Sequence, residues 1–180
     1  MNNQRFSPSD ANFILILARN KTSTKEVIIR DVRISDRFIE LDISIHKEEK
    51  VDDILSLLTE IGKLNDIITI KERSLRKEEA IKKGIELFND ERYWLSHEVL
   101  EGIWKKSLGV EKELLNGLIL IAAAYVHYQK NEEERCISIF GRAMSKLINI
   151  DGKYYEIDID LIKNNLSRIL NGEKIFKFSI

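Results

Sequence analysis

The fold of this chain is decided by one stretch, Leu114-Leu-Asn-Gly-Leu-Ile-Leu-Ile-Ala-Ala-Ala-Tyr-Val-His-Tyr128. It is apolar on nearly every side of a helix, and such a helix has to be surrounded by other elements. We therefore predict a central helix over Glu111–Lys130. Its strongly polar members, Asn116 and His127, are 11 positions apart. Three helical turns place both on one stripe.

The helical spacing of apolar residues continues on both sides of this central helix. It predicts helices over Arg76–Asn89, Tyr93–Leu108 and Glu132–Leu147, joined by short links. A further helix begins after Asp158 or Asp160, either of which can cap its first turn. Short links are typical of antiparallel neighbours, so residues 75–180 are predicted to form an all-α helical bundle.

The first 74 residues follow a different period. Apolar and polar residues alternate in Glu26–Ile34 and Arg37–Ile45, which predicts an antiparallel hairpin that turns at Ser35 and Asp36. Across Val51–Ile61 the apolar spacing changes to three and four, which predicts one helix packed on the sheet. We therefore expect residues 1–74 to form a small α+β domain, an antiparallel sheet with one helix.

Three shorter apolar segments complete the expected sheet. The run Phe13–Ala18 fits either a helix that starts near Pro8 or a buried strand, and a strand is favoured. A further strand is expected at Ile67, Ile68 and Ile70. The end of the chain, Lys174–Ile180, also alternates as a strand does, and one hypothesis is that it returns to pair with the N-terminal sheet. Between the two domains, the charged segment Glu72–Arg76 is the expected boundary.

Composition limits the classes of function. The chain has 180 residues, 43% hydrophobic and 33% charged, so it is expected to fold. Its 29 basic and 30 acidic residues leave a net charge of −1. Because the overall charge does not attract a polyanion, nucleic acid is not expected as a partner. The single proline and eight glycines, with abundant Ile, Lys and Glu, match the composition reported for thermophile proteins.

The expected location is the cytoplasm, without a membrane partner. Cys136 is the single cysteine and cannot form an internal disulfide. The sequence also has no secretory leader and no uninterrupted apolar run approaching about 18 residues. A homo-oligomer is possible.

The candidate site begins on the helix Tyr93–Leu108. With a rotation of 100° per residue, one face of this helix is expected to be buried. The residues on that buried stripe are Tyr93, Ser96, Leu100, Ile103 and Trp104. His97 and Glu101 lie at the edge of the stripe as an i, i+4 pair, and Glu98 turns further toward solvent. A histidine and a carboxylate so placed can act as base and orienting group, or bind a metal.

An antiparallel neighbour can add His127 to this pair. The predicted catalytic residues are therefore His97, Glu101 and His127, which are also the possible ligands of a divalent metal cofactor. The predicted binding residues around them are Trp94, Glu98, Trp104, Asn116 and Tyr128, with Tyr125 as a further wall. The alternative interpretation is a polar network in which these groups only satisfy each other.

The segment His97-Glu98-Val99-Leu100-Glu101 is distinct from the zinc-protease signature, whose second histidine stands where this chain has Glu101. The sequence also lacks the glycine-rich loops that cradle nucleotides and the nucleophile elbow of hydrolases.

The segment Gly84-Ile-Glu-Leu-Phe-Asn-Asp-Glu-Arg-Tyr-Trp-Leu-Ser-His-Glu-Val-Leu-Glu-Gly-Ile-Trp104 closely resembles the signature of the domain of unknown function catalogued as family 309. Leu115–His127 and Arg142–Leu147 resemble the second and third core helices of that family. The resemblance covers about Lys77–Leu147, with a weaker extension to Leu170. It implies a small helical bundle and one shared pocket for His97, Glu98, Glu101, Trp104 and His127. It implies no reaction, and the N-terminal segment resembles no family.

Two functions remain open from the sequence. One is a small enzyme that performs acid–base or metal-assisted hydrolysis at the His/Glu pocket. The other is a non-catalytic interaction or oligomerisation module, in which the His/Glu cluster is structural. The second function predicts an exposed apolar patch.

Overall fold

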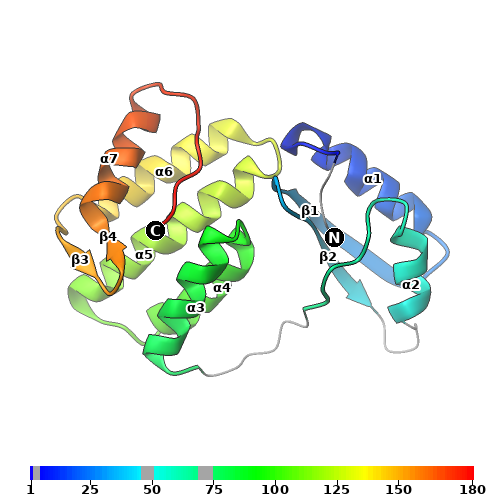
Figure 1. Cartoon of the computed structure of the whole chain (residues 1–180), viewed down its shortest axis with the longest axis horizontal. Helices are drawn as coiled ribbons and strands as arrows, with labels where there is room; N and C mark the ends of the chain where they lie inside the picture. Colours follow the sequence, from blue (N-terminus) through cyan, green and yellow to red (C-terminus); the bar gives the residue numbers. More distant parts are fainter. Residues whose placement is uncertain (2–4, 46–50, 69–74) are drawn as a thin grey trace. The chain divides into compact units, whose positions relative to one another are not determined.

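The computed structural model describes residues 1, 5–45, 51–68 and 75–180 (Figure 1). The chain divides into two compact units. The N-terminal unit comprises Met1–Lys71 together with Gln129–Asn131, and the helical unit comprises Glu72–Tyr128 and Glu132–Ile180. The predicted fold class is confirmed, because an N-terminal helix and a two-stranded antiparallel hairpin precede a mostly helical region.

The N-terminal unit is built around the predicted hairpin. Its elements are η1 (Pro8–Asp10), α1 (Ala11–Lys21), β1 (Val27–Ile34), β2 (Ile39–Ile45) and α2 (Val51–Leu58). The two strands pair from Ile34 opposite Ile39 to Val27 opposite Ile45. Ser35 closes the turn, since its Oγ accepts a hydrogen bond from the Phe38 N–H at 2.8 Å. The predicted Ser turn and the helix at residue 51 are confirmed, although the helix ends at Leu58.

One face of the hairpin forms the core of this unit. Its side chains pack with those of α1 and α2, and the buried members are Ala11, Ile14, Ala18, Ile29, Val32, Ile34, Ile39, Ile54, Leu58 and Ile61. The loop Gln129–Asn131 also groups with this unit. The Ile34 N–H donates to the Gln129 carbonyl at 3.0 Å, and Lys130 pairs with Asp31 at 3.2 Å.

The favoured strand at residues 13–18 is wrong, because these residues lie inside α1. The start signal around Pro8 decides the local structure, since the Asp10 carboxylate accepts a hydrogen bond from the Ser7 N–H at 2.8 Å. Only one side of this apolar run is covered, and Phe13 and Ile16 stay 59% and 50% exposed. An almost continuous apolar run has no period that distinguishes a helix from a buried strand.

The further strand at Ile67 and Ile68 is also wrong. Both residues are exposed and lie outside any helix or strand, and the sheet of the described N-terminal residues has the order β1-β2. The third residue of that prediction, Ile70, lies outside the described residues, as do His46 and most of the predicted boundary at residues 72–76.

The helical unit contains the five predicted helices. They are α3 (Lys77–Asn89), α4 (Tyr93–Trp104), α5 (Gly109–Tyr128), α6 (Glu133–Leu147) and α7 (Ile159–Leu170), with a short ribbon of β3 (Lys153–Tyr154) and β4 (Ile157–Asp158) before α7. Asp158 is the cap of α7, because its Oδ1 accepts a hydrogen bond from the Leu161 N–H at 2.9 Å. The apolar spacing of this helix predicts that Leu161 faces the core together with Ile162 and Leu166, but Leu161 is 52% exposed.

The helix α5 is central in this unit, as the sequence predicts. It packs against α4 on one side and α6 on another (Figure 1). Tyr125 of α5 is fully buried and stacks on Tyr93 of α4 at 4.6 Å between ring centroids. No helix in the described part of the chain is both long and apolar enough to cross a membrane.

The expected strand at the end of the chain is wrong. Residues 173–180 run without regular secondary structure along the helical unit. The Tyr125 hydroxyl donates to the Phe176 carbonyl at 2.7 Å, and the Ile180 N–H donates to Asn89 Oδ1 at 3.0 Å. Phe178 packs its ring 5.7 Å from that of Tyr125. The alternation in this segment therefore comes from an extended chain that covers helices.

Candidate functional site

His97 projects from the edge of α4, and two contacts fix its imidazole ring. The ring of Trp94 stacks on it with 5.4 Å between centroids and an interplanar angle of 7°. On the other helix, the Ile119 carbonyl of α5 lies 3.4 Å from His97 Nδ1. A proton on Nδ1 can be donated to this carbonyl, which leaves the lone pair of Nε2 for a proton or a metal ion.

Glu98 and Glu101 bring two carboxylates to the same place. One ligand atom of His97, one of Glu98 and one of Glu101 all lie within 4.8 Å of one another, and all three residues are half-buried. We call these three residues the His/Glu cluster. Glu98 was expected to turn further toward solvent, but its long side chain reaches back to the other two.

The two carboxylates of the His/Glu cluster differ in their partners. Glu101 Oε2 lies 3.5 Å from the ammonium of Lys105, one turn further along α4. Among the described residues, the Glu98 carboxylate has neither a hydrogen bond nor an ion pair. The Glu98 carboxylate is therefore available to a cation that approaches the cluster.

The position of the His/Glu cluster follows from how α4 packs. The predicted stripe is buried at Tyr93, Ser96, Leu100 and Ile103, so the residues beside it lie at the boundary with solvent. Ser96 anchors the helix by donating to the Gly84 carbonyl of α3 at 2.8 Å. Because these contacts hold α4 on two neighbours, the cluster is carried on a fixed surface.

His127 lies away from the His/Glu cluster. Its Nδ1 forms a close hydrogen bond with the carboxylate of Glu132, which stands before the first turn of α6. Ile119, which faces His97, is eight residues before His127. This separation corresponds to about 12 Å along the axis of α5. In the described part of the chain, the group of three residues able to hold a metal does not include His127.

The other predicted site residues are spread over the helical unit. The ammonium of Lys112 lies over the Trp104 ring, 5.0 Å from the ring centroid. Tyr125 is buried in the core. Asn116 and Tyr128 are half-buried on α5. Of the predicted binding residues, the structure brings Trp94 and Glu98 directly to His97.

A second polar group, which the sequence analysis missed, lies where α3 and α5 begin. Glu111 Oε1 accepts from Lys77 Nζ at 2.5 Å and from the Tyr154 hydroxyl at 2.9 Å. The hydrogen bond from Lys77 is the main cause that lowers the pKa of Glu111 below its usual 4.5, and the Tyr154 hydroxyl lowers it further. Burial, together with this carboxylate, raises the pKa of Tyr154 above its usual 10.0. The sequence does not predict this group, because residues 77, 111 and 154 are far apart in the chain and no helical or strand period relates them.

Part of the helical unit matches a known protein family. Residues 81–138 match the family described as "Domain of unknown function (DUF309)", so the helical region contains a DUF309 domain. The match is narrower than the predicted Lys77–Leu147, and it includes the whole His/Glu cluster. The N-terminal region is unassigned, and no curated protein matches the chain.

Proposed function

We propose that the DUF309 domain of this chain binds a divalent metal ion through His97, Glu98 and Glu101, and uses it for hydrolysis. The observation that carries the proposal is the convergence of three ligand atoms within 4.8 Å of one another. This ligand set replaces the one expected from the sequence, because Glu98 takes the place of His127.

The chemistry of the donors supports a metal of the zinc or manganese kind. One imidazole nitrogen and two carboxylates form a mixed nitrogen and oxygen set, which suits Zn²⁺ and Mn²⁺. Metal-binding histidines commonly donate their other ring N–H to a carbonyl or carboxylate. The Ile119 carbonyl at 3.4 Å from His97 Nδ1 is placed for that role.

The three residues also have roles that suit hydrolysis. His97, Glu98 and Glu101 would hold the ion, and a divalent ion held there would supply a water of lowered pKa for hydrolysis. Trp94 limits the approach of solvent from the face of the His97 ring on which it stacks.

Calorimetric titration of the untagged full chain with Zn²⁺ and with Mn²⁺ tests this proposal. We expect one ion per chain in the wild type, and an affinity at least about tenfold weaker in His97→Ala and in Glu98→Gln. His127→Ala is the matched control, because it removes a histidine of α5 that pairs with Glu132 instead. Equal loss in His127→Ala, or no saturable binding of either metal by the folded wild type, would contradict the proposal.

A second candidate function rests on the place where the link after α4 meets the first turn of α5. Leu108 and Val110 are 81% and 68% exposed, and only Gly109 separates them. Adjacent exposed apolar residues favour an interaction or oligomerisation module. Light scattering of the full chain and of Leu108→Ser would test self-association. A wild-type oligomer that Leu108→Ser converts to monomer supports this function, and a monomeric wild type excludes self-association through Leu108 and Val110.

A further inference from the structure

The helices α4 and α5 meet along a line that continues beyond the His/Glu cluster. At one end of this line, the Ile119 carbonyl lies 3.4 Å from His97 Nδ1. At the other end, the ammonium of Lys112 lies 5.0 Å from the centroid of the Trp104 ring. Seven residues separate His97 from Trp104, and seven separate Lys112 from Ile119. The two contacts therefore share one antiparallel register and stand about 10 Å apart along the helices.

Lys112 is a cation that is held in place without an anion beside it. The residue is half-buried, and its ammonium rests over the ring of Trp104. Among the described residues, this ammonium has neither an ion pair nor a hydrogen bond. By contrast, the nearby Lys105 already pairs with Glu101 at 3.5 Å. A cation–π contact positions a lysine without neutralising its charge, so Lys112 stays available to an anion.

Asn116 lies between these two contacts on the α5 side. It stands four residues after Lys112 and three before Ile119, so helical geometry places it on the same face as Lys112. Between Leu114 and His127, the positions of α5 that are not buried are 116, 120, 123 and 127, a stripe that begins with Asn116. In the part of the chain that the structure describes, the Asn116 amide has no hydrogen-bond partner. It can therefore donate to a ligand on this stripe.

The α4 side of the line brings the His/Glu cluster close to Lys112. Glu101 stands four residues after His97 and three before Trp104, so these three residues follow one row of α4. Three residues of a helix correspond to about 4.5 Å, which places the ring under the Lys112 ammonium one step along this row from the cluster. A cation bound at the cluster and the Lys112 ammonium can therefore act on one ligand.

From this arrangement, and resting on the metal site proposed above, we infer that the surface between α4 and α5 binds the phosphate group of a phosphate monoester. The two carboxylates of the His/Glu cluster balance the charge of a divalent cation, so the Lys112 ammonium leaves this surface positive. A phosphate monoester has three non-bridging oxygens, one each for the cation, the Lys112 ammonium and the Asn116 amide. A carboxylate has only two oxygens and leaves one of these groups unused. The substrate class of the proposed hydrolysis is therefore a phosphate monoester.

Calorimetric titration of the full chain with phenylphosphonate tests this inference, with and without saturating Zn²⁺ or Mn²⁺. Phenylphosphonate has the three oxygens of a monoester, and its phosphorus–carbon bond resists hydrolysis. We expect saturable binding to the metal-loaded chain, at least about tenfold tighter than binding to the metal-free chain. Benzoate, which offers a carboxylate on the same ring, should bind more weakly.

Variants of the two α5 residues separate this site from the metal site. Lys112→Gln is expected to weaken the binding of phenylphosphonate to the metal-loaded chain about tenfold, because a charge-assisted contact is lost. The affinity for the metal itself should change less than about twofold. Asn116→Ala should have a smaller effect on phenylphosphonate. Lys82→Gln is the matched control, because Lys82 is an exposed lysine of α3 without an ion pair among the described residues.

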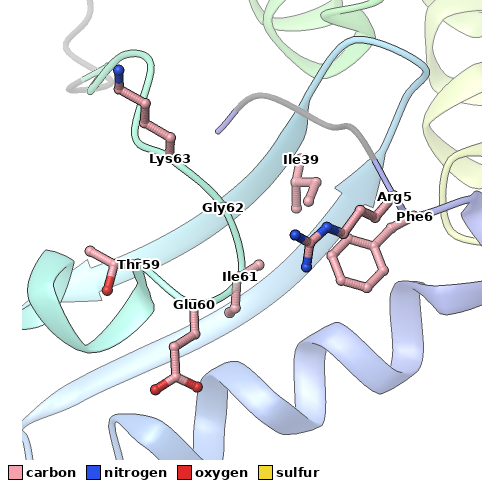
Figure 2. A pocket seen from close by; sticks show the side chains of 8 residues that line it. All are labelled: Arg5, Phe6, Ile39, Thr59, Glu60, Ile61, Gly62 and Lys63. Atoms are coloured by element: carbon pink, nitrogen blue, oxygen red, sulfur yellow. The ribbon is translucent and has the colours of Figure 1, made fainter.

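Spectra of the full chain locate the bound probe. In ¹H–¹⁵N correlation spectra of the Zn²⁺-loaded chain, we expect phenylphosphonate to shift the amides of Lys112 and Asn116. The N-terminal unit contains a pocket of about 320 Å³, and its lining includes Ile61, Gly62 and Lys63 (Figure 2). Shifts confined to the amides of these three residues would place the probe in that pocket and overturn the inference.

The remaining outcomes distinguish this inference from the proposed metal site. Saturable binding of a metal without binding of phenylphosphonate overturns the inference and leaves the metal site standing. A folded wild type that binds neither Zn²⁺ nor Mn²⁺ contradicts both. The inference is also overturned if benzoate binds as tightly as phenylphosphonate, or if Lys82→Gln weakens binding as much as Lys112→Gln.

Discussion

Glu111 is the residue at which separate parts of the helical unit are joined. It accepts hydrogen bonds from Lys77 of α3 and from Tyr154 of β3, although 34 and 43 positions separate it from them. The side chain of Glu111 is 29% exposed and that of Lys77 is 42% exposed, so solvent screens the pair. Its contribution to stability is therefore expected to be modest.

The substitution Glu111→Gln tests this contribution through its pH dependence. The pKa of Glu111 is lowered in the folded chain, so ionised Glu111 stabilises the fold above its usual pKa of 4.5. This stabilisation is lost as the pH falls through the lowered value. We expect Glu111→Gln to reduce the free energy of unfolding by about 1 kcal/mol at pH 7. The deficit should disappear in acid, as measured by urea unfolding at several pH values.

Glu113→Gln is the matched control for this measurement. Glu113 lies on the same first turns of α5, but it is 52% exposed and pairs only with Lys146 among the described residues. We expect a change of less than about 0.5 kcal/mol at pH 7. A Glu111→Gln deficit that persisted unchanged at pH 3 would show that the carboxylate charge is not its cause.

Individual site residues could be predicted from the sequence only as far as one helix extends. His97 and Glu101 are paired by the sequence because a single helical period places them together, whereas the same period turns Glu98 further toward solvent. His127 was added because it shares a stripe with Asn116, but a stripe gives the angle around α5 and not the distance along it. The bond from His127 to Glu132 crosses a loop, and no period predicts such a contact.

At the scale of the elements, two helix pairs approach closely where one partner carries a glycine. A Cβ added at Gly117 of α5 would lie 2.6 Å from both Cγ and Cδ2 of Leu147 of α6. A Cβ added at Gly84 of α3 would lie 2.6 Å from Cδ2 of Leu100 of α4. Both leucines are fully buried, so they have little space in which to move.

We therefore expect Gly117→Ala to lower the free energy of unfolding by about 1–3 kcal/mol, because the added methyl group overpacks the contact with Leu147. Alanine is the better helix former, and in open space the same change stabilises a helix by up to about 1 kcal/mol. Gly102→Ala of α4 is the matched control, since nothing lies within 4 Å of its added Cβ.

Denaturant unfolding of these variants distinguishes overpacking from other causes. In the Leu147→Ala background, Gly117→Ala should cost less than it does in the wild type, because the clash is removed. An equal cost in both backgrounds would show that the approach of α6 is not responsible. Stabilisation by Gly117→Ala would contradict the prediction itself.

Helices were predicted better than extended segments, and the reason is physical. The amphipathic helices α3, α4 and α6 each bury one side, so the period of 3.6 is visible in the sequence. An extended segment shows a period of two whether or not it pairs with a strand. Residues 175–180 alternate because they lie on helices, and their backbone bonds go to Tyr125 and Asn89.

At the scale of the whole molecule, the described residues form two hydrophobic cores with no residue in common. Ile14 of α1 is fully buried in the N-terminal core, and Phe140 of α6 is fully buried in the helical one. Each core belongs to one compact unit. The domain division at residue 74 to 75, expected from the sequence, remains a proposal that the unfolding of the chain can test.

We expect calorimetry of the full chain to resolve two thermal transitions. Ile14→Ala should lower one midpoint and Phe140→Ala the other, because each removes about 2–5 kcal/mol of packing from one core. A single transition that both variants shift equally would contradict independent cores. Tyr125→Phe should lower only the midpoint that Phe140→Ala lowers, because the hydrogen bond that it removes, from the Tyr125 hydroxyl to the Phe176 carbonyl, lies within the helical unit.

The chain has two tryptophans, Trp94 and Trp104, and α4 carries both. Intrinsic tryptophan fluorescence therefore reports on the helical unit and is silent about the N-terminal unit. Because Trp94 stacks on His97 with 5.4 Å between centroids, a paramagnetic ion held at the His/Glu cluster would quench its emission. The protein thus contains its own optical reporter, positioned so that occupancy of the cluster can be followed without any label.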